Sequence, residues 1–552
     1  MLKEDTEAEY YSETGSYNQT INLDQEYSSR PNAIDMGIHH RFNSMHNLII
    51  TANGNLNSNS LNQVTNTHTF ADIVDLNSLT GINNNISDVL TGSSKGSYMA
   101  RYNEGNTQFK ISFSGSVDDN STRTDFENTT FLYNPDSTIY ANQFIDNYTD
   151  NTSLSFNPQF VQRVSSKWFL ITNINTGVNT QKTKQTQGNM LPVETKIDSL
   201  SPDFQRHNIY FIPGITMRRS TQSSQFALTL NASWNNFNTT LWDVNRDYGT
   251  VFNVLPGLQY EKRFRTGRRL NIRYRTNVII PSAGQLLPVF STANPLFLAS
   301  GNEDLEPAYN HNAYFEYRIF DQFSFTSIFT RFGGSYTANN ISWQQTITDD
   351  YVKITSPINV DWDYTAFGHL NFSTPWRRAG IKFNLLFNEN WHKGINLVNS
   401  EENIINSLTH SVNLSIENHR KQWLDARIGT SIAYTNAQYS IQEELDNKYF
   451  NIVYYSSVYL MPSDRWNLNI IGNLTQYNSQ TLDEQVSIPS IDAALSLYFL
   501  KGNRGVLNLR VIDLLNRNTG FQQISDINYL MQVNSNTLGR YVLLSFKYRL
   551  TG

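Results

Sequence analysis

The segment that decides the fold lies near the end of the chain, where residues 540–550 read RYVLLSFKYRL. Alternate positions form one apolar face, made of Val542, Leu544, Phe546, Tyr548 and Leu550. The positions between them form a mixed to polar face, made of Tyr541, Leu543, Ser545, Lys547 and Arg549. A period of two is the signature of a β-strand, because successive side chains point to opposite sides. The segment therefore predicts a strand with one apolar and one polar side.

The same alternation recurs upstream. It is clearest in residues 491–499, 466–475, 424–432 and 411–416. The chain is rich in aromatic residues (30 Tyr, 32 Phe), yet its mean hydropathy is negative. A transmembrane β-strand produces this combination, because one residue faces lipid and the next faces a polar lumen. Strands of a soluble sandwich also alternate, so the pattern by itself leaves the environment open.

The connections between strands come in two alternating kinds. Short ones are expected near Leu500–Asn503, Met461–Asp464, His419–Gln422, Thr374–Arg378, Phe320–Gln322, Arg265–Arg268, Arg219–Ser223, Val164–Ser166, Glu104–Asn106 and Asn43–Met45. Long ones are expected near Met531–Leu538, Tyr477–Pro489, Gln438–Lys448, Lys393–Ile404, Thr337–Ile358, Pro281–Pro307, Asn238–Gly249, Gln181–Gln205, Val117–Asn151 and Leu56–Lys95. Tight periplasmic turns and long extracellular loops are typical of outer-membrane barrels.

Counting from a first strand near Tyr17–Tyr27 predicts about 22 strands, the size of plugged outer-membrane transporters. We therefore expect an all-β fold. Residues 1–552 are predicted to form a single transmembrane antiparallel β-barrel in the outer membrane.

Charge differs between the two kinds of connection. Several short turns are basic, at Arg218–Arg219, Arg263–Arg269, Arg377–Arg378, Arg420–Lys421 and Lys501–Arg504. Several long loops are acidic, at Asp118–Asp119, Glu401–Glu402, Glu443–Glu444 and Asp483–Glu484. Trp376, Trp423 and Trp466 lie in or beside short turns, where an interfacial aromatic belt would place them, although Trp also pairs well in ordinary strands.

Composition excludes several classes of protein. The net charge of −6 is spread along the chain without a basic block, so nucleic-acid binding is not indicated. The absence of cysteine excludes disulfides and thiolate metal sites. No stretch approaches the roughly 20 apolar residues of a transmembrane helix. The acidic start, Met1–Asp5, has no apolar signal region, so we expect the chain to be the C-terminal part of a longer precursor.

Three segments resemble TonB-dependent outer-membrane receptors, specifically the outer membrane protein β-barrel family. Pro281–Pro288, Asn294–Leu296 and Gly301–Pro307 together are similar to the family's QL-P and GN-x-x-L-x-P pattern. Val511–Asn516 is similar to its Asp/Asn-Leu-Phe-Asn kink in the penultimate strand, and residues 540–550 are similar to its C-terminal assembly signal. The chain departs from the family where Leu550 is followed by Thr551 and Gly552 instead of ending in an aromatic residue.

The resemblance implies a transport barrel that takes up a large nutrient such as a siderophore, a glycan or a peptide. It implies contact with outer-membrane lipid and lipopolysaccharide and with the barrel assembly machinery, and with a plug domain and the TonB complex in a full-length protein. We find no plug or TonB box within the sequence and expect the chain to be the barrel region alone. The alternative is a structural, adhesive or porin-like barrel without TonB-driven transport. A soluble β-rich binding protein is the third interpretation, but the fixed repeat of a propeller or solenoid is missing.

Catalytic and metal-binding interpretations are weak. His39 and His40 are sequence neighbours, which point to opposite sides of a strand and do not chelate one metal. The pairs Asp349–Asp350, Glu401–Glu402 and Glu443–Glu444 fit glycosidase or calcium sites only formally, and we interpret them as solvated loop residues.

The pattern GxSxG occurs at Gly92–Gly96, but Ser94 lacks the strand–turn–helix context of a nucleophile elbow. We interpret Asn53–Gly54 as a turn and Gly333–Gly334 as a bend or bulge. We expect a short self-packed helix within residues 70–90, inside a long loop. The sequence thus nominates no catalytic, cofactor or metal site and predicts a protein that is not an enzyme. The long loops are the expected place of substrate contact, with no single residue named.

Overall fold

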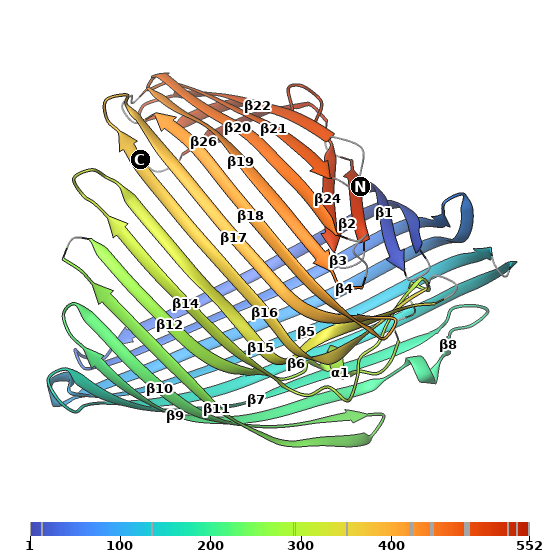
Figure 1. The fold of residues 1–552 in the computed structure, drawn as a ribbon, viewed down its shortest axis with the longest axis horizontal. Helices are drawn as coiled ribbons and strands as arrows, with labels where there is room; N and C mark the ends of the chain where they lie inside the picture. Colours follow the sequence, from blue (N-terminus) through green and yellow to red (C-terminus); the bar gives the residue numbers. More distant parts are fainter. Residues whose placement is uncertain are drawn as a thin grey trace.

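The structure is a computed structural model of the 552-residue chain. It describes residues 2–12, 15–133, 136–265, 267–290, 292, 294–348, 352–418, 423–441, 446–479, 486–526, 529–536 and 539–549. Nearly all of them belong to one 26-stranded sheet that curves into a barrel of tilted strands (Figure 1). Its neighbouring wall strands are antiparallel, which confirms the all-β barrel predicted from the alternation.

The elements follow one another along the chain with few interruptions. The first half contains β1 (Leu2–Ser12), β2 (Gly15–Arg41), β3 (His46–Ala71), β4 (Val74–Tyr102), η1 (Asn103–Gly105), β5 (Thr107–Tyr133), β6 (Asp136–Arg163), β7 (Trp168–Asn189), β8 (Thr195–Lys196), η2 (Asp198–Leu200), β9 (Asp203–Ser220), β10 (Ser224–Leu241), β11 (Val244–Arg263) and β12 (Arg268–Ile279). The second half contains α1 (Ala283–Leu286), β13 (Phe297–Ala299), β14 (Ala308–Phe320), β15 (Ser327–Ile347), β16 (Lys353–Trp376), β17 (Ile381–Val398), β18 (Glu401–Asn418), β19 (Leu424–Tyr439), β20 (Asn447–Ser463), β21 (Trp466–Ser479), β22 (Val486–Phe499), β23 (Gly505–Ile512), β24 (Gly520–Asp526), β25 (Tyr529–Ser535) and β26 (Tyr541–Tyr548).

The wall contains 22 strands within the described part of the chain. Of the 26 strands, β8 and β13 are short side pieces. The pair β23–β26 and the pair β24–β25 are two parts of one hairpin, because their registers differ by only two residues (Gly505 opposite Tyr548, Gly520 opposite Ser535). The expected number is therefore confirmed, although the first strand begins at Leu2 and not near Tyr17.

A kink divides that last hairpin, at the position where the family-like motif 511–516 lies. Asp513 and Asn516 adopt left-handed backbone conformations (φ 48° and 53°) between β23 and β24. The buried Asp513 carboxylate accepts hydrogen bonds from the backbone N–H groups of Arg517 and Asn518 (3.2 and 3.1 Å). The carboxylate thus satisfies amides that lose their ladder partners at the break, which confirms the predicted kink.

The two ends of the sheet meet only in part. In the half that carries the long hairpins, β1 lies between β2 and β25, with Leu2 opposite Gln25 and Glu4 opposite Ser535. Toward the end with the short turns, residues 26–41 of β2 pair with β3 alone and β26 pairs with β23 alone, as far as the structure describes the chain. Residues 26–41 and all of β26 are exposed. Within the described residues, the hydrogen-bond ladder therefore closes the barrel in one half only, and we call the unpaired edges of β2 and β26 in the other half the seam.

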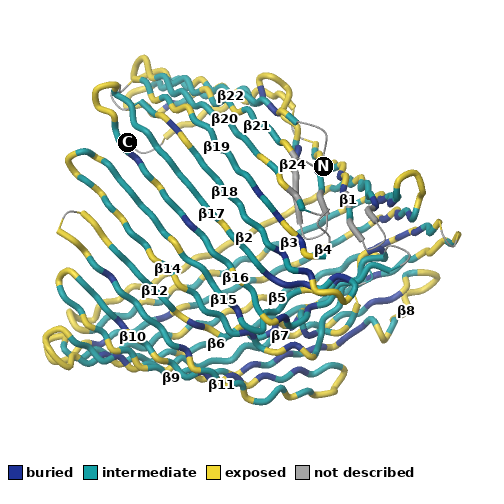
Figure 2. The backbone as a smooth tube through the Cα atoms, viewed as in Figure 1, coloured by how far each residue is buried: buried dark blue, intermediate teal, exposed yellow. Residues whose placement is uncertain are grey.

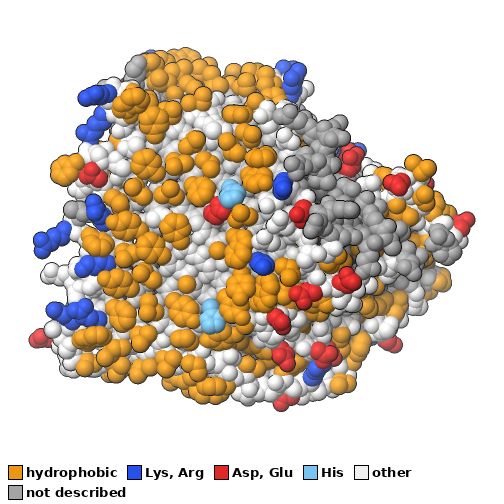
Figure 3. Space-filling view, viewed as in Figure 1, with side chains coloured by type: hydrophobic (Ala, Val, Ile, Leu, Met, Phe, Trp, Pro, Cys, Tyr) orange, Lys and Arg blue, Asp and Glu red, His pale blue; other side chains and the backbone are white. Residues whose placement is uncertain are grey.

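The two faces of the wall differ in polarity. On β10, Leu228, Leu230 and Trp234 lie exposed on one face, whereas Thr229 and Asn231 alternate with them on the other. The face of the barrel seen in Figure 3 is rich in apolar side chains over the wall strands, and charged side chains gather toward its two ends. Outward apolar and inward polar faces are the arrangement of a membrane barrel.

The long connections are mostly strand and not irregular loop. Residues 70–90, where a short helix was expected, form the tip and upper part of the β3–β4 hairpin, with a turn at Asp72–Ile73. That expectation was wrong, because both strands find ladder partners there, β3 on β2 and β4 on β5. Asn53–Gly54 is likewise inside β3, with Gly54 opposite Gly92, and is not a turn.

The structure also tests the predictions for Gly333–Gly334 and for the three tryptophans beside short turns. Gly333 and Gly334 lie in regular register opposite Phe367 and Ala366, so the predicted bend is absent there. Trp376, Trp423 and Trp466 are 52%, 49% and 44% exposed beside the short turns, as the belt interpretation requires. No helix in the described ranges has the length and apolar character needed to span a membrane.

Burial is moderate throughout the wall. Figure 2 shows most wall residues at intermediate burial, with many of the buried ones toward the long-hairpin end. A barrel this wide is not filled by its own side chains. The main buried apolar cluster instead forms where a loop enters the barrel from the long-hairpin end.

Candidate functional site: a loop packed inside the barrel

The loop that joins β12 to β14, which we call the loop 280–307, enters the barrel and does not extend into solvent in its described residues 280–290, 292 and 294–307. It begins with a capping box: Gln285 N–H donates to Ser282 Oγ (3.4 Å), and Ser282 N–H donates to Gln285 Oε1 (2.9 Å). The reciprocal bonds satisfy amides at the start of the single-turn α1. The turn directs two apolar side chains, Ala283 and Leu286, toward the wall.

Apolar packing anchors the loop on the lumen face of the wall. Leu286 and Leu305 are 0% and 1% exposed and form a cluster with Ala283, Phe204 and Phe237. Phe204 lies on β9 and Phe237 on β10, on the inward face between the exposed apolar positions of these strands. Burial of two leucines contributes about 1.5–3 kcal/mol each, which favours the docked loop over one extended into water.

Hydrogen bonds extend the contact along β7. The backbone N–H of Ala283 donates to Gln181 Oε1 (3.1 Å). The Gln187 side chain, which is fully buried, donates to Thr292 Oγ1 (2.5 Å). The loop therefore covers the inner surface of three neighbouring strands, β7, β9 and β10.

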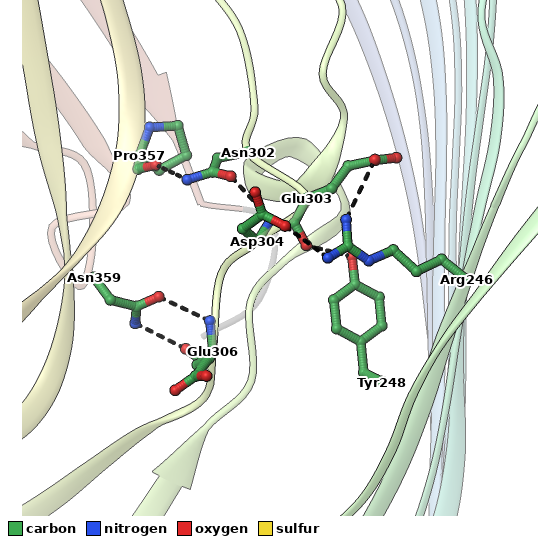
Figure 4. Close-up of polar contacts among 8 residues, drawn as sticks. All are labelled: Arg246, Tyr248, Asn302, Glu303, Asp304, Glu306, Pro357 and Asn359. Carbon is green, nitrogen blue, oxygen red and sulfur yellow. Dashed lines mark hydrogen bonds and ion pairs between the residues drawn. The ribbon is translucent and has the colours of Figure 1, made fainter.

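The far side of the loop binds a different part of the wall (Figure 4). Asn302 Nδ2 donates to the carbonyl of Pro357 (3.0 Å). Asn359 makes two bonds with Glu306: its Oδ1 accepts from Glu306 N–H (2.8 Å), and its Nδ2 donates to the Glu306 carbonyl (2.9 Å). In addition, β13 pairs in parallel with β16. The loop thus spans from β7–β10 to β16 across the lumen.

The β15–β16 hairpin meets the loop because its upper part leaves the wall. Gln344 and Gln345 of β15 pair in parallel with Leu397 and Val398 of β17, strands that are separated by β16 lower down. Ser342 Oγ also donates to the Ile395 carbonyl (2.6 Å). The displaced part of β16 carries Pro357 and Asn359, which hold the far side of the loop.

A cation from β11 clamps the loop at its acidic turn (Figure 4). Arg246 contacts Glu303 (3.4 Å) and Asp304 (2.7 Å), and Tyr248 OH donates to the Glu303 carbonyl (2.8 Å). These groups lie close to the tip of the β10–β11 hairpin, outside the membrane-spanning part. The hydrogen bond to Asp304 raises the pKa of Arg246, and burial raises the pKa of Tyr248.

A cavity of about 580 Å³ remains beside the clamp. Its lining includes Phe237, Arg246, Tyr248, Asp304, Glu306 and Tyr309. Apolar walls with a few polar groups are typical of a ligand pocket. The arrangement offers one cation, two carboxylates and two phenol groups to a polar solute.

The residues singled out in the sequence lie elsewhere. Ser94 is in the interior of β4, opposite Ala52 and Gly115, with strand on both sides. His39 and His40 are exposed neighbours on β2, and Glu401–Glu402 begin β18 as exposed residues. The pairs Asp349–Asp350 and Glu443–Glu444 fall outside the described residues. Within the described ranges, no group of three or more metal-ligating side chains was found.

The sequence nominated the loop as a family-like pattern but did not predict its inward position. Gly301 explains one requirement of that pattern, because a Cβ there would lie 2.5 Å from the backbone of Leu287. Arg246 and Tyr248 were missed. Their partners lie 55–58 residues away, and no local spacing signals such a contact.

Residues 228–548 match the family described as "Outer membrane protein beta-barrel family". No curated protein sequence matches the chain.

Solved structures with a similar arrangement are distant in sequence. The siderophore receptor PirA from Pseudomonas aeruginosa is 8% identical, with 97% of this chain and 80% of that chain covered and a TM-score of 0.37. P. aeruginosa FpvA bound to heterologous pyoverdines is 8% identical, with 98% and 72% covered and a TM-score of 0.43. The alcaligin outer-membrane receptor FauA from Bordetella pertussis is 9% identical, with 98% and 76% covered and a TM-score of 0.37. Scores this low carry no argument about function.

The family match covers more than half of the chain, and the 22-strand wall agrees with it independently. The short turns accordingly face the periplasm, the long hairpins face outward from the cell, and the apolar outer face contacts membrane lipid. The chain therefore belongs to the outer membrane protein β-barrel family and lies in the outer membrane.

Proposed function

We propose that this chain is the transport barrel of a TonB-dependent receptor and that it takes up a large polar nutrient, such as a siderophore, a glycan or a peptide. The observation that carries the proposal is the loop 280–307, which is docked inside a wide, polar-walled lumen on its extracellular side. The docked loop narrows the lumen and borders a cavity lined by apolar and polar groups, which is the kind of surface that a receptor needs to retain its cargo.

We propose that residues 1–552 form one barrel domain. A lumen of 22 strands needs a further occupant to hold back solutes, which we propose to be a plug domain coupled to the TonB complex. Barrel assembly machinery and lipopolysaccharide are the further partners that we propose for the membrane-embedded state. Transport of this kind requires binding and movement, so the function proposed involves no catalytic step.

Uptake in living cells tests the proposal. The complete gene product is expressed in a host that lacks its own receptors, with and without the inner-membrane TonB complex. The probes are a labelled ferric siderophore, a labelled maltodextrin and a labelled oligopeptide. We expect one of the three to enter only when the TonB complex is present.

The alternatives give different results in the same assay. Entry of all small probes at equal rates without the TonB complex would indicate a porin-like barrel. Entry of none of them, with the barrel correctly assembled, would indicate a structural or adhesive role. Either result would refute the proposed function.

A further inference from the structure

A row of directly opposed residues crosses the lumen face below the loop, nearer the periplasmic end. Successive ladder partners define it across seven strand pairs, from β7 to β16. The row reads Phe169, Arg218, Ala227, Gln259, Arg273, Tyr314, Gly333 and Phe367. Arg275 and Arg331 lie two positions along their strands from Arg273 and Gly333, and therefore on the same face. We call these four arginines, Arg218, Arg273, Arg275 and Arg331, the arginine row.

The row lies on the lumen side. Ala227 alternates along β10 with the exposed, lipid-facing Leu228 and Leu230. It lies ten residues, an even number, before the inward Phe237 that anchors the loop. Because ladder partners share a face, the whole row faces the lumen.

Aromatic rings hold three of these guanidinium groups in place. Arg218 lies 5.0 Å from the Phe169 ring centroid, and Arg273 lies 5.8 Å from that of Tyr314. Arg331 lies between two rings, 4.2 Å from Tyr314 and 5.5 Å from Phe367. A Cβ on Gly333 would meet the Phe367 ring at 2.7 Å, so glycine at this position makes room for the two rings. Stacking orients the guanidinium groups and leaves their N–H edges free to donate.

The four arginines have no carboxylate partner within 4.0 Å among the described residues. Glu316 faces the same surface, but its contact is with Arg318 (3.8 Å), and Glu261 is shared by Arg263 and Arg269. The Nε atoms of Arg218 and Arg331 are buried without a hydrogen-bond acceptor. Buried donors and unpaired charges are costly unless a partner satisfies them. The guanidinium charges without carboxylate partners therefore favour a ligand with acceptor oxygens.

Two cavities border the row and leave space for such a ligand. One of about 310 Å³ is lined by Arg218, Arg273, Arg275 and Gln259. The other, of about 460 Å³, is lined by Arg331 together with His369 and Asn388. The donors of both cavities are arginine, amide and imidazole groups, which fit carboxylate or phosphate oxygens.

We propose that the arginine row is a binding site for a solute carrying two or more carboxylate or phosphate groups. The row passes such a solute along the lower lumen wall, which rests on the proposed transport function. Bidentate arginine contacts bind planar carboxylates and phosphates with both charge and geometry. The four guanidinium groups also attract anions to this part of the lumen, because the carboxylates of Glu261 and Glu316 contact other arginines.

Calorimetric titration of the purified chain in nonionic detergent at low salt tests the site. The probes are citrate and pyrophosphate, with maltotriose as the uncharged control. The test variant is the double substitution Arg273→Gln and Arg331→Gln. The matched control is Arg219→Gln, the exposed neighbour of Arg218 on the opposite side of β9. Heat-modifiable migration on a gel verifies that each variant is folded.

We expect citrate and pyrophosphate to bind and maltotriose not to bind. The double variant should raise Kd by roughly tenfold or more, since a hydrogen bond to a charged group contributes about one factor of ten. Arg219→Gln should leave Kd within about twofold, the range of a surface charge. The affinity should fall as salt rises.

Equal affinity for maltotriose would overturn the proposal, as would unchanged binding by the folded double variant. Binding that is lost equally in Arg219→Gln would show a diffuse charge effect and would overturn it too. Binding only of an acidic peptide, with neither small anion bound, would assign the row to a protein segment and refute the solute site. Failure of TonB-dependent uptake with anion binding intact would refute the proposed function and leave the site standing.

Discussion

Replacement of Leu305 by alanine should release the loop 280–307 from the lumen wall. Leu305 is 1% exposed and packs among Phe204, Phe237 and Leu286. A buried Leu→Ala change costs about 2–5 kcal/mol, through lost transfer energy and the cavity left behind. At about 1.4 kcal/mol for each factor of ten, the open population of the loop should rise roughly 30-fold or more.

Substitution of the clamp should have a smaller effect. Arg246 contacts Glu303 and Asp304, but its side chain is 41% exposed, and the Asp304 side chain is 82% exposed. Exposed ion pairs contribute about 0.2–1 kcal/mol each. Arg246→Gln should therefore raise the open population only several-fold. The apolar anchor, not the visible salt bridge, should hold the loop.

Because the chain has no cysteine, a single introduced cysteine is the only thiol that a maleimide reagent can label. A single Ala283→Cys reporter is 6% exposed in the docked loop and becomes reactive only when α1 leaves the wall. The rate of maleimide labelling then measures the open population in the parent, Leu305→Ala and Arg246→Gln backgrounds. Equal acceleration by both substitutions, or none by Leu305→Ala, would refute the reasoning.

Three further predictions concern the wall and its turns. In the seam, residues 26–41 pair with β3 on one side only, so every second amide should exchange rapidly with deuterium while the amides that face β3 stay protected. Uniform protection of residues 26–41 would contradict this and would mean that a partner fills the seam. Glu389 and His410 form a pair on the outer face (2.6 Å). His410→Leu alone leaves the carboxylate unpaired and should lower the free energy of unfolding by about 1–3 kcal/mol, whereas adding Glu389→Leu should restore or exceed the parent value. Urea titration in micelles measures both effects. In the periplasmic turn, the hydrogen bond from Ser324 lowers the pKa of Asp321. The stabilisation of the turn by Asp321 is therefore complete above the ordinary aspartate pKa of about 3.9 and is lost as pH falls through the lower folded value. Protection of the amides of residues 321–326 from hydrogen exchange that does not fall over this pH range, or that falls equally in Asp321→Ala, would contradict this prediction.

The wall of this barrel follows from local pattern. Period-two alternation is a property of neighbouring residues, so segments such as 541–548 and 466–475 could be assigned as strands without knowledge of their partners. The kink at Asp513–Asn516 was expected only from the resemblance of residues 511–516 to the family motif, and the structure shows that its capping groups lie within five residues of each other. What local pattern did not reveal is how far the strands extend beyond the membrane. Residues 70–90 became strand because two neighbouring strands already offered ladder partners.

The sequence by itself indicated an all-β outer-membrane barrel of about 22 strands, its apolar and polar faces, and the alternation of short and long connections. Only the tertiary structure decided that the loop 280–307 lies inside the lumen, that four arginines from β9, β12 and β15 form one row, and that a seam separates β2 from β26. The physical reason is distance along the chain. A face is set by adjacent residues, whereas the contact between Arg246 and Asp304 joins residues 58 positions apart and exists only once curvature and register have brought their strands together.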